Sequence, residues 1–371
     1  MKSFHYGIRG IPLLWLKNYL KRKQYTVSHG MASSIMSLIF SIPQGTVLGP
    51  LLFIIFINDL HSCTSLFTLL FADDTTFLVE GWDLPALISH TNEELAKATE
   101  WFRSNLLTLN VTKTKFILIS PFLAKDAVVP DLNIDGKKIT RISKLSNEKS
   151  VRFLGVWLDE DFSFTDHVEK LIRKLKTGLH KLRSARTSCP LRVRKQIYHS
   201  LFESYLLFGI TIYSAASEPL LEQIFLLQKK AIRLVADVHY LAHTDPLFLE
   251  LNITKFHNLI IQERSIMVHK YRGGKLPPSF SRDFLTSVSD DQIGRRMDPL
   301  CFSLPPNPQP FNHRSPHKLL IQSWNSLPFE IKSEGEPIKF RSLIDQKAIS
   351  NIQTECLVEN CRVCLRSDDE F

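Results

Sequence analysis

The chain has 371 residues, of which 44% are apolar and 22% are charged, and this composition excludes a disordered or fibrous protein. At roughly 150 residues per domain, the length predicts two or three domains. Lysine and arginine exceed aspartate and glutamate by nine, which favours a polyanionic partner. The six cysteines are too few for a disulfide scaffold. No apolar run approaches the roughly 20 residues of a membrane span, so we expect an intracellular protein with no membrane partner.

The first sixty residues predict helices on either side of a mixed segment. Residues 11–20 are apolar and favour a helix, with Pro12 in its first turn. Residues 27–40 are mixed and could be extended, and residues 43–45 predict a turn. The apolar run 50–60 predicts a buried helix that begins with proline.

The middle of the chain predicts hairpins around one long helix. Residues 66–79 predict a β-hairpin with Asp73 and Asp74 at its turn. Residues 92–106 have the periodicity of an amphipathic helix. Three further extended elements are a strand at 116–120, a hairpin around the pair Asp135–Gly136, and a strand at 151–158 that contains Gly155.

From about residue 165 the pattern becomes helical. The predicted helices span 166–186, 190–208, 219–238 and 255–271, with short closing helices at 319–324 and 340–349. Eight prolines in residues 277–316 predict a loop or linker, and the last 21 residues predict a loose tail. Cys356, Cys361 and Cys364 in that tail have part of a zinc-site spacing but lack a nearby fourth ligand.

The excess positive charge is concentrated in one predicted helix. Residues 170–195 hold ten lysines or arginines and no acid, and the rest of the chain is nearly neutral. Apolar residues in 168–182 recur every three or four positions and mark the face that docks. Five cations lie largely off this face: Lys170, Arg173, Lys174, Lys181 and Arg183. Such a surface binds nucleic-acid phosphates, and the plain alternative is a solvated helix face.

Asp73 and Asp74 form the main chemical candidate. Two adjacent carboxylates at a turn place hard oxygen ligands in a small space, which suits Mg²⁺ that bridges to phosphates. The plain alternative is a solvated turn, because aspartate is common in turns.

Five blocks, in this order along the chain, resemble reverse transcriptases of non-LTR (LINE-type) retrotransposons. They are residues 42–53 continuing to 57–60, similar to the second conserved palm block; 71–75, similar to the catalytic aspartate turn; 110–115, similar to the lysine-bearing block; 153–159 through 166–167, similar to the primer-grip hairpin and the start of the thumb; and 227–233, 243–247 and 324–328, similar to the region beyond the thumb. The resemblance covers most of the chain.

This resemblance implies RNA-directed DNA synthesis on an RNA template and a DNA primer. Asp73 would be a catalytic metal ligand for Mg²⁺ or Mn²⁺, with Asp74 as a second or supporting ligand. Gln44 and Gly45 would lie beside the incoming nucleotide or template, and Lys113 would orient phosphates or donate a proton to pyrophosphate. The basic helix would track the primer–template backbone. Alternatively, Gln44 and Gly45 form a simple turn and Lys113 is a surface lysine.

The implied fold class is α+β, a partial palm with antiparallel hairpins followed by an all-helical thumb and a helical C-terminal extension. The expected divisions are a partial palm at 1–121, primer-grip-like hairpins at 122–165, thumb and post-thumb helices at 166–272, a proline-rich linker at 273–318, and C-terminal helices with a loose tail at 319–371.

The resemblance also predicts a missing metal ligand. These polymerases use a further aspartate from an earlier palm strand, and here no Asp or Glu precedes Asp59. We therefore expect an N-terminally truncated enzyme that binds its metal weakly, lacks the fingers and has little activity alone. A non-enzymatic nucleic-acid-binding remnant and an incomplete gene model are the alternatives. The family resemblance also implies a nuclear location.

Overall fold

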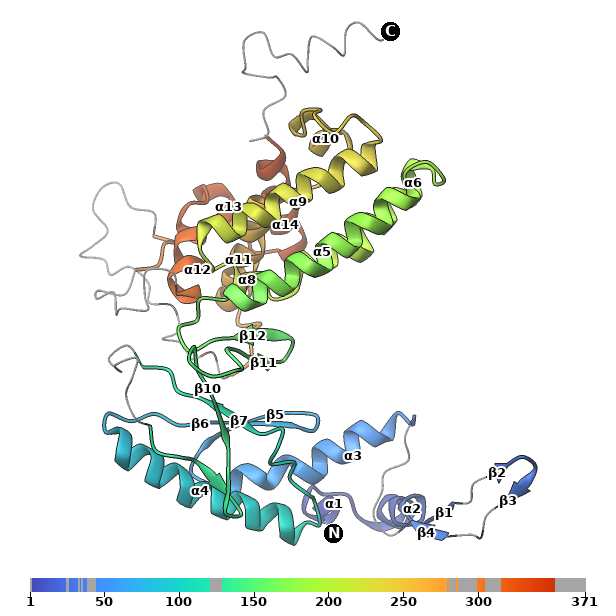
Figure 1. Ribbon diagram of the computed structural model, residues 1–371, viewed down its shortest axis with the longest axis vertical. Coiled ribbons are helices and arrows are strands. Elements are labelled where there is room, and N and C mark those ends of the chain that lie inside the picture. Colours follow the sequence, from blue (N-terminus) through green and yellow to red (C-terminus); the bar gives the residue numbers. More distant parts are fainter. Residues whose placement is uncertain are drawn as a thin grey trace, which may run out of the picture. The chain divides into compact units, whose positions relative to one another are not determined.

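The computed structural model of the protein describes residues 2–24, 27–32, 34, 36–38, 45–120, 129–278, 280, 285, 299–303 and 315–350. The chain forms two compact units, the first made of Met1–Phe116 with Ala124–Thr140 and the second of Ile117–Leu123 with Arg141–Phe371 (Figure 1). Helices and small antiparallel sheets together give an α+β protein, as predicted. In the described part of the chain, no helix is both long enough and apolar enough to cross a bilayer.

The first unit joins short strands to two main helices. Its elements are α1 (Lys2–His5), α2 (Gly10–Leu20), β1 (Arg22–Gln24), β2 (Val27–Ser28), β3 (Met31–Ala32), β4 (Met36–Leu38), α3 (Leu48–Ile57), the 3-10 helix η1 (Asn58–Ser62), β5 (Phe67–Phe71), β6 (Asp74–Leu78), α4 (Leu84–Ser104), β8 (Asn133–Ile134) and β9 (Lys137–Lys138). Two strands lie where the chain passes between the units, β7 (Lys115–Ile117) and β10 (Thr140–Ile142).

Most of the predicted elements of this unit are confirmed. The pair Asp135–Gly136 forms the turn between β8 and β9, and both residues have positive φ, as a type I′ hairpin turn requires. Helix α4 starts eight residues before its predicted start, because the Asp83 carboxylate accepts a hydrogen bond from the backbone N–H of Ala86 and caps it. The prediction that α3 is buried is wrong in part, since 54% of the Ile54 side chain is exposed.

The core of the first unit lies between α4 and the β5–β6 hairpin, and both α3 and α4 lie on the same side of that hairpin (Figure 1). Buried Glu94 of α4 fixes the start of β5. Its carboxylate pairs with Lys97 and accepts hydrogen bonds from the Ser65 N–H at 2.6 Å and the Thr64 hydroxyl at 2.9 Å. These contacts, the lysine first, lower the pKa of Glu94 to about 2. The base of the hairpin is therefore anchored to the helix.

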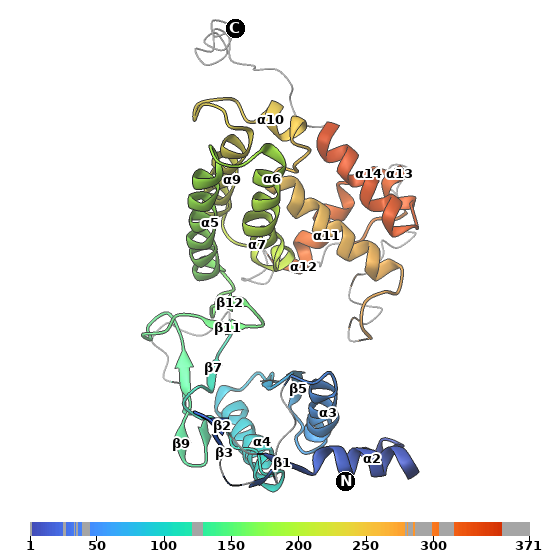
Figure 2. The same cartoon turned by 90° about the vertical axis from the view of Figure 1, so that its right-hand side faces the viewer.

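The second unit is a helical assembly that begins with a small hairpin (Figure 2). Its elements are β11 (Val151–Phe153), β12 (Val156–Leu158), α5 (Thr165–Ala185), α6 (Leu191–Tyr198), the π-helical turn η2 (His199–Glu203), α7 (Ser204–Leu207), α8 (Ile210–Tyr213), α9 (Glu218–Ala236), α10 (Asp245–Glu250), α11 (Phe256–Arg272), α12 (Pro316–Asn325), α13 (Phe329–Ser333) and α14 (Pro337–Ser350). The four long predicted helical segments are confirmed, and α8, α10 and α13 were not predicted.

The prediction of a single strand over 151–158 is wrong. Phe153 pairs with Val156, and Leu154 and Gly155 between them both have positive φ, so the segment is a hairpin with a two-residue turn. A Cβ on Gly155 would lie 2.7 Å from the ring of Phe208, which leaves no room for a side chain there.

Two apolar clusters hold the helices of the second unit together. The apolar stripe of α5 is buried as predicted, and it packs with α6, α9 and the first half of α11 in one cluster. Around the fully buried Trp324, helices α11, α12 and α14 form the other. The tail with its three cysteines lies outside the described residues, as does most of the proline-rich stretch.

Buried His167 should make the stability of the second unit depend on pH. Its Nδ1 accepts a hydrogen bond from the Trp157 N–H at 3.3 Å, and burial, with the positive charges of Lys174 and Lys170, lowers its pKa to about 4. A histidine buried in its neutral form stabilises the fold above its unfolded pKa near 6.5, and this contribution is lost as the pH falls toward 4. The predicted loss is up to about 3 kcal/mol.

Urea unfolding at pH 7, 5.5 and 4.5, followed by the circular dichroism of the helices, measures this loss. In His167→Asn, which keeps an acceptor but does not titrate, we expect a shallower decline with acid than in the wild-type chain. His180→Asn, on the exposed side of the same helix, serves as control and should decline like the wild type. Equal declines in all three proteins would contradict the assignment.

Candidate functional site

The candidate carboxylates lie at the tip of the β5–β6 hairpin. Phe71 pairs with Asp74, so the two-residue turn consists of Ala72 and Asp73, and Asp74 is the first residue of β6. The hairpin prediction is confirmed, but the turn lies one residue before the predicted pair. The reason is the register, since the last pair of the ladder already includes Asp74. The two aspartates therefore belong to different parts of the hairpin: Asp73 lies in the turn, and Asp74 lies in a strand.

The turn holds a strained backbone next to the first carboxylate. Ala72 has φ of +51°, and positive φ at the first central residue only is the pattern of a type II′ turn. Glycine is the residue that favours this position, and an L-residue with a side chain costs roughly 1–2 kcal/mol there. Strain of this kind clusters at functional sites, and the anchored base of the hairpin is able to hold it.

Both carboxylates are exposed to solvent. Within the residues that the structure describes, neither Asp73 nor Asp74 has a side-chain hydrogen bond or ion pair, and no three Asp, Glu, His or Cys side chains gather to hold a metal. Two later aspartates that could have completed the set are engaged elsewhere, Asp131 with Lys138 and Asp135 with Arg103. Asp126 lies outside the described residues.

The two faces of the β5–β6 hairpin differ. Leu70 and Phe77 are half-buried and face the cores around α4 and η1. Phe67, Leu69 and Phe71 alternate with the inward residues of β5, and their side chains are 58%, 37% and 63% exposed. The tip with its carboxylates therefore adjoins an exposed, largely apolar strand face.

The remaining candidates for nucleotide contact are only partly described. Gln44 lies outside the described residues, whereas Gly45 is exposed and has φ of +79°. Lys113 is exposed in the loop after α4, where the side chain of Asn110 accepts a hydrogen bond from the Lys113 backbone N–H at 3.2 Å. The described residues show no contact between Lys113 and either carboxylate, and its proposed role stays a prediction.

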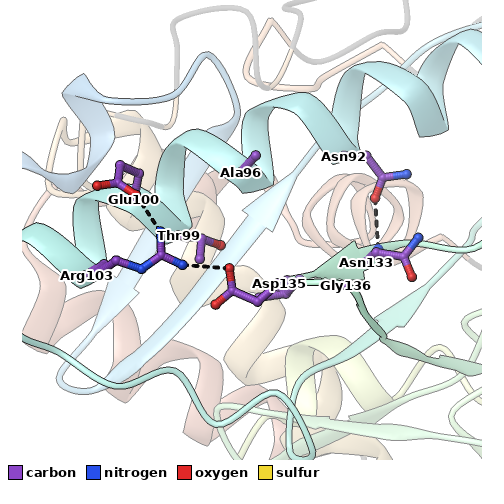
Figure 3. A pocket seen from close by; sticks show the side chains of 9 residues that line it. Asn92, Ala96, Thr99, Glu100, Arg103, Asn133, Asp135 and Gly136 are labelled. Carbon is purple, nitrogen blue, oxygen red and sulfur yellow. Dashed lines mark hydrogen bonds and ion pairs between the residues drawn. The ribbon is translucent and has the colours of Figure 1, made fainter.

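A surface pocket of about 570 Å³ lies elsewhere in the first unit, between α4 and the β8–β9 hairpin (Figure 3). Sequence reasoning did not predict it. Arg103 forms ion pairs with Glu100 at 2.6 Å and with Asp135 at 3.0 Å, so the charged side chains that line the pocket are paired with one another. The side-chain oxygen of Asn92 accepts a hydrogen bond from the backbone N–H of Asn133 at 2.8 Å. The lining does not include the carboxylates of the turn.

The predicted basic face of α5 is largely exposed. Arg173, Lys174, Lys181 and Arg183 are exposed and form no ion pair with any described carboxylate. Lys170 differs, because it pairs with Asp166 at 2.6 Å and its Nζ lies 3.0 Å from the centroid of the Trp157 ring.

Sequence reasoning missed one cation of this surface. Lys176 is also exposed and has no ion-pair partner among the described residues. The spacing of the apolar stripe did not single it out, because Lys176 lies four residues after Ile172 and three before Leu179, at the edge of that stripe. We call Arg173, Lys174, Lys176, Lys181 and Arg183 the basic face of α5.

Comparison with known proteins shows what the chain is similar to. Residues 2–158 match the model of the family described as reverse transcriptase (RNA-dependent DNA polymerase). The RNA-directed DNA polymerase from mobile element jockey of Drosophila melanogaster is 24% identical over 66% of this chain and 27% of its own length. Two probable RNA-directed DNA polymerases of the same organism, from transposon BS and transposon X-element, are 26% and 24% identical, each over 64% of this chain.

These findings confirm the resemblance to reverse transcriptases of non-LTR retrotransposons, and with it the resemblance to RNA-directed DNA polymerases. The matched residues 2–158 include the carboxylate turn and end with β12. The chain spans about a quarter of the length of these relatives.

Proposed function

We propose that the first unit carries part of a nucleotidyl-transfer centre that copies RNA into DNA, with Asp73 and Asp74 as the metal-binding carboxylates of a palm. The observation that carries this proposal is the hairpin tip itself. Two adjacent carboxylates are exposed without partners among the described residues, at a strained turn inside the segment that matches the reverse transcriptase family. Oxygen ligands of this kind suit Mg²⁺ or Mn²⁺, the ions that assist phosphoryl transfer.

The donor set at the tip fits a divalent ion only in part. A magnesium ion takes six oxygen ligands, and it is commonly held by one or two carboxylates together with substrate phosphates and water. Asp73 and Asp74 supply the carboxylates, and the nucleotide would supply the phosphates. Since the described residues place no third acid at the turn, we expect weak ion binding without nucleotide and slow DNA synthesis by this chain on its own.

Other parts of the chain would serve the same reaction. Gln44, Gly45 and Lys113 would contact the nucleotide or template, and the second unit would act as a thumb. In that role the basic face of α5 would follow the phosphates of an RNA template paired with a DNA primer. Its exposed cations without ion-pair partners in the described part of the chain support this assignment.

Primer extension tests the proposal. On an RNA template with an annealed DNA primer, we expect slow extension by the wild-type chain that requires Mg²⁺ or Mn²⁺. Asp73→Ala should reduce the rate by roughly a hundredfold or more, because metal assistance is worth several kcal/mol. The matched control is Glu80→Ala, an exposed acid just beyond β6.

The outcomes separate the two parts of the proposal. Fast synthesis that depends on Asp73 would show that the expected impairment is wrong and the catalytic assignment right. Synthesis that survives Asp73→Ala would contradict the catalytic assignment. If no synthesis is detected, electron paramagnetic resonance of Mn²⁺ with deoxynucleotide decides, because an equal affinity in wild type and Asp73→Ala would also contradict it.

A second candidate is a nucleic-acid-binding protein without catalysis. The observation that favours it is the basic face of α5, which does not depend on the carboxylate turn. In that case binding would be sensitive to salt and to the cations of α5, and Asp73→Ala would leave it unchanged.

A further inference from the structure

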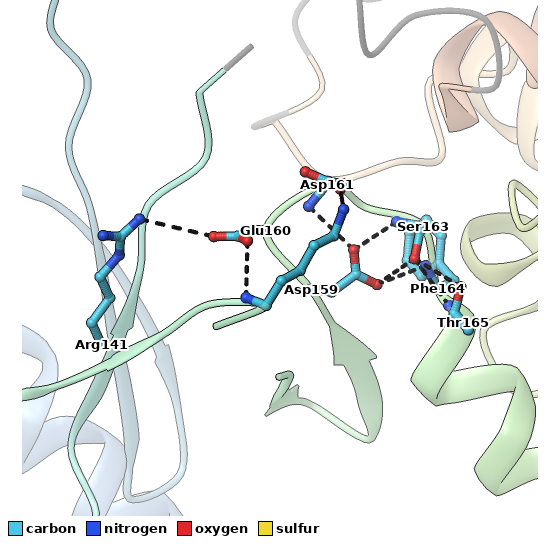
Figure 4. A network of polar contacts seen from close by, with 8 residues as sticks. Arg141, Asp159, Glu160, Asp161, Ser163, Phe164 and Thr165 are labelled. Carbon is cyan, nitrogen blue, oxygen red and sulfur yellow. Dashed lines mark hydrogen bonds and ion pairs between the residues drawn. The ribbon is translucent and has the colours of Figure 1, made fainter. Parts of the chain in front are cut away.

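The loop between β12 and α5 is organised around one buried carboxylate (Figure 4). Asp159 follows β12 and is only 7% exposed. Its Oδ1 accepts hydrogen bonds from the backbone N–H groups of Asp161 at 3.2 Å and Ser163 at 2.8 Å. Its Oδ2 accepts hydrogen bonds from the Phe164 N–H at 2.9 Å and the Ser163 hydroxyl at 3.0 Å. Four donors from residues 161–164 of this loop therefore converge on a single side chain.

These hydrogen bonds hold a backbone that the residues would not otherwise adopt. Phe162 and Phe164 have φ of +51° and +55°, a region that residues with a side chain rarely enter. Asp159 compensates by binding the N–H groups that this conformation turns inward. The resulting bend directs the side chain of Phe164 into the core, where it is 1% exposed.

The same carboxylate supports an indirect cap of α5 through Ser163. Phe164 is the N-cap residue of α5 and has no side chain that can accept a hydrogen bond. The Ser163 hydroxyl instead accepts the Thr165 N–H at 3.3 Å, while it donates to Asp159. A negative charge near the start of a helix also interacts favourably with the helix dipole. The first residue of α5 is thus held by Ser163, which Asp159 holds in turn.

Further contacts tie the start of α5 to the strands before it. The Lys144 N–H donates to Glu160 at 2.9 Å, and the Lys144 ammonium pairs with Asp161. One turn into the helix, Lys170 joins Asp166 to the Trp157 ring of β12. The helix and the hairpin are therefore joined by a network rather than by a flexible linker.

We propose that Asp159 is a positioning residue, which fixes the direction of α5 relative to the β11–β12 hairpin so that the basic face of α5 meets several phosphates at once. The inference rests on the proposed binding of nucleic acid by α5. Its physical reason is that several weak phosphate contacts add up only when one rigid surface makes them together. Without the contacts of Asp159, the start of α5 would be held less firmly, and fewer of its cations would be in place for the phosphates at any moment.

Binding measurements on the full chain test this role. The probe is a fluorescently labelled RNA–DNA hybrid duplex, titrated at several salt concentrations at a temperature below unfolding, with helical content checked by circular dichroism. For Asp159→Ala we expect at least about tenfold weaker binding at low salt and a salt slope reduced by about 1–2, since the slope counts phosphate contacts. Asp159→Asn keeps one acceptor oxygen and should fall between this variant and the wild type.

The control is Glu250→Ala, which removes one acidic group from an exposed position at the end of α10, outside the contacts that hold the loop before α5. It should bind like the wild type. If Asp159→Ala is less stable but keeps wild-type affinity and slope while folded, Asp159 is only structural and the proposal fails. Should Asp159→Ala not fold, the same criterion applied to Asp159→Asn decides. If the affinity of the wild-type chain does not depend on the salt concentration, the proposed binding by α5 is instead refuted.

Discussion

Replacing Gly178 with alanine is expected to destabilise the helical unit by about 1–2 kcal/mol, although alanine is the better helix former. Gly178 lies on the buried side of α5, where a Cβ would stand 2.8 Å from the backbone oxygen of Leu201 and 3.7 Å from the ring of Phe202. The obstacle is backbone in the π-helical turn η2, so it cannot move like the end of a flexible side chain.

Two opposing effects decide the sign of this change. Alanine in a helix interior gains roughly 0.5–1 kcal/mol over glycine, whereas overpacking a closely packed contact costs about 1–3 kcal/mol. Because Phe202 is fully buried, η2 cannot move away from the added methyl group. We therefore expect the cost of overpacking to exceed the gain in helix propensity. A relaxed contact between α5 and η2 would also disturb the site from which the basic face of α5 is presented.

Chemical unfolding of Gly178→Ala, followed by circular dichroism, measures the loss. The control is Gly335→Ala, because a Cβ there meets no atom within 4 Å and φ is not positive. That variant should be neutral or slightly more stable, since alanine restricts the unfolded chain. If Gly178→Ala proved as stable as this control, the close approach of α5 and η2 would be contradicted.

Neutralising the basic face of α5 by five glutamine substitutions should weaken nucleic-acid binding by roughly a hundredfold to a thousandfold at low salt. The five cations have no described ion-pair partner to lose, so the change acts mainly on the bound state. If each contacts one phosphate, the slope of log Kd against log salt should fall by about 4. Fluorescence anisotropy with the RNA–DNA hybrid measures both quantities.

The control removes the same charge from other places. It carries glutamine at five exposed lysines: Lys149, Lys230, Lys270, Lys275 and Lys339. Net charge alone would weaken binding equally in both variants, whereas a local binding surface would spare the control. Equal losses would therefore contradict the assignment to α5, and a loss in Asp73→Ala would contradict the independence of binding from the carboxylate turn.

Elements with a local sequence signal were predicted correctly, whereas an element that depends on distant contacts was not. Helix α5 was predicted within one residue at each end, because an apolar stripe with a period near 3.6 is a local signal. The Asp135–Gly136 turn was equally clear, since both residues tolerate positive φ. The strand prediction at 151–158 was wrong because Leu154 gives no turn signal, and the hairpin forms where Gly155 packs against distant Phe208.

The candidate site shows the same division. Its chemical groups could be predicted from the sequence alone. Two adjacent aspartates in a predicted hairpin, Asp73 and Asp74, and a cluster of ten cations are visible without any knowledge of the fold. The register of β5 on β6 could not be predicted from the sequence, and this register makes Ala72 and Asp73 the turn residues. The pairing of Lys170 with Asp166, four residues before it on the same helix, is a local signal, whereas its contact with the Trp157 ring of β12 was decided by the tertiary structure.

The sequence by itself determined which chemical groups this protein has and which helical face docks, because residue types and periodicity are local properties of the chain. Only the tertiary structure decided which of those groups stay available to a ligand. It also decided that Asp159, an unremarked acid after a strand, organises the start of α5, and that Gly178 permits close contact with η2. Both roles depend on where backbone N–H and C=O groups of other segments end up, and those positions are set by packing.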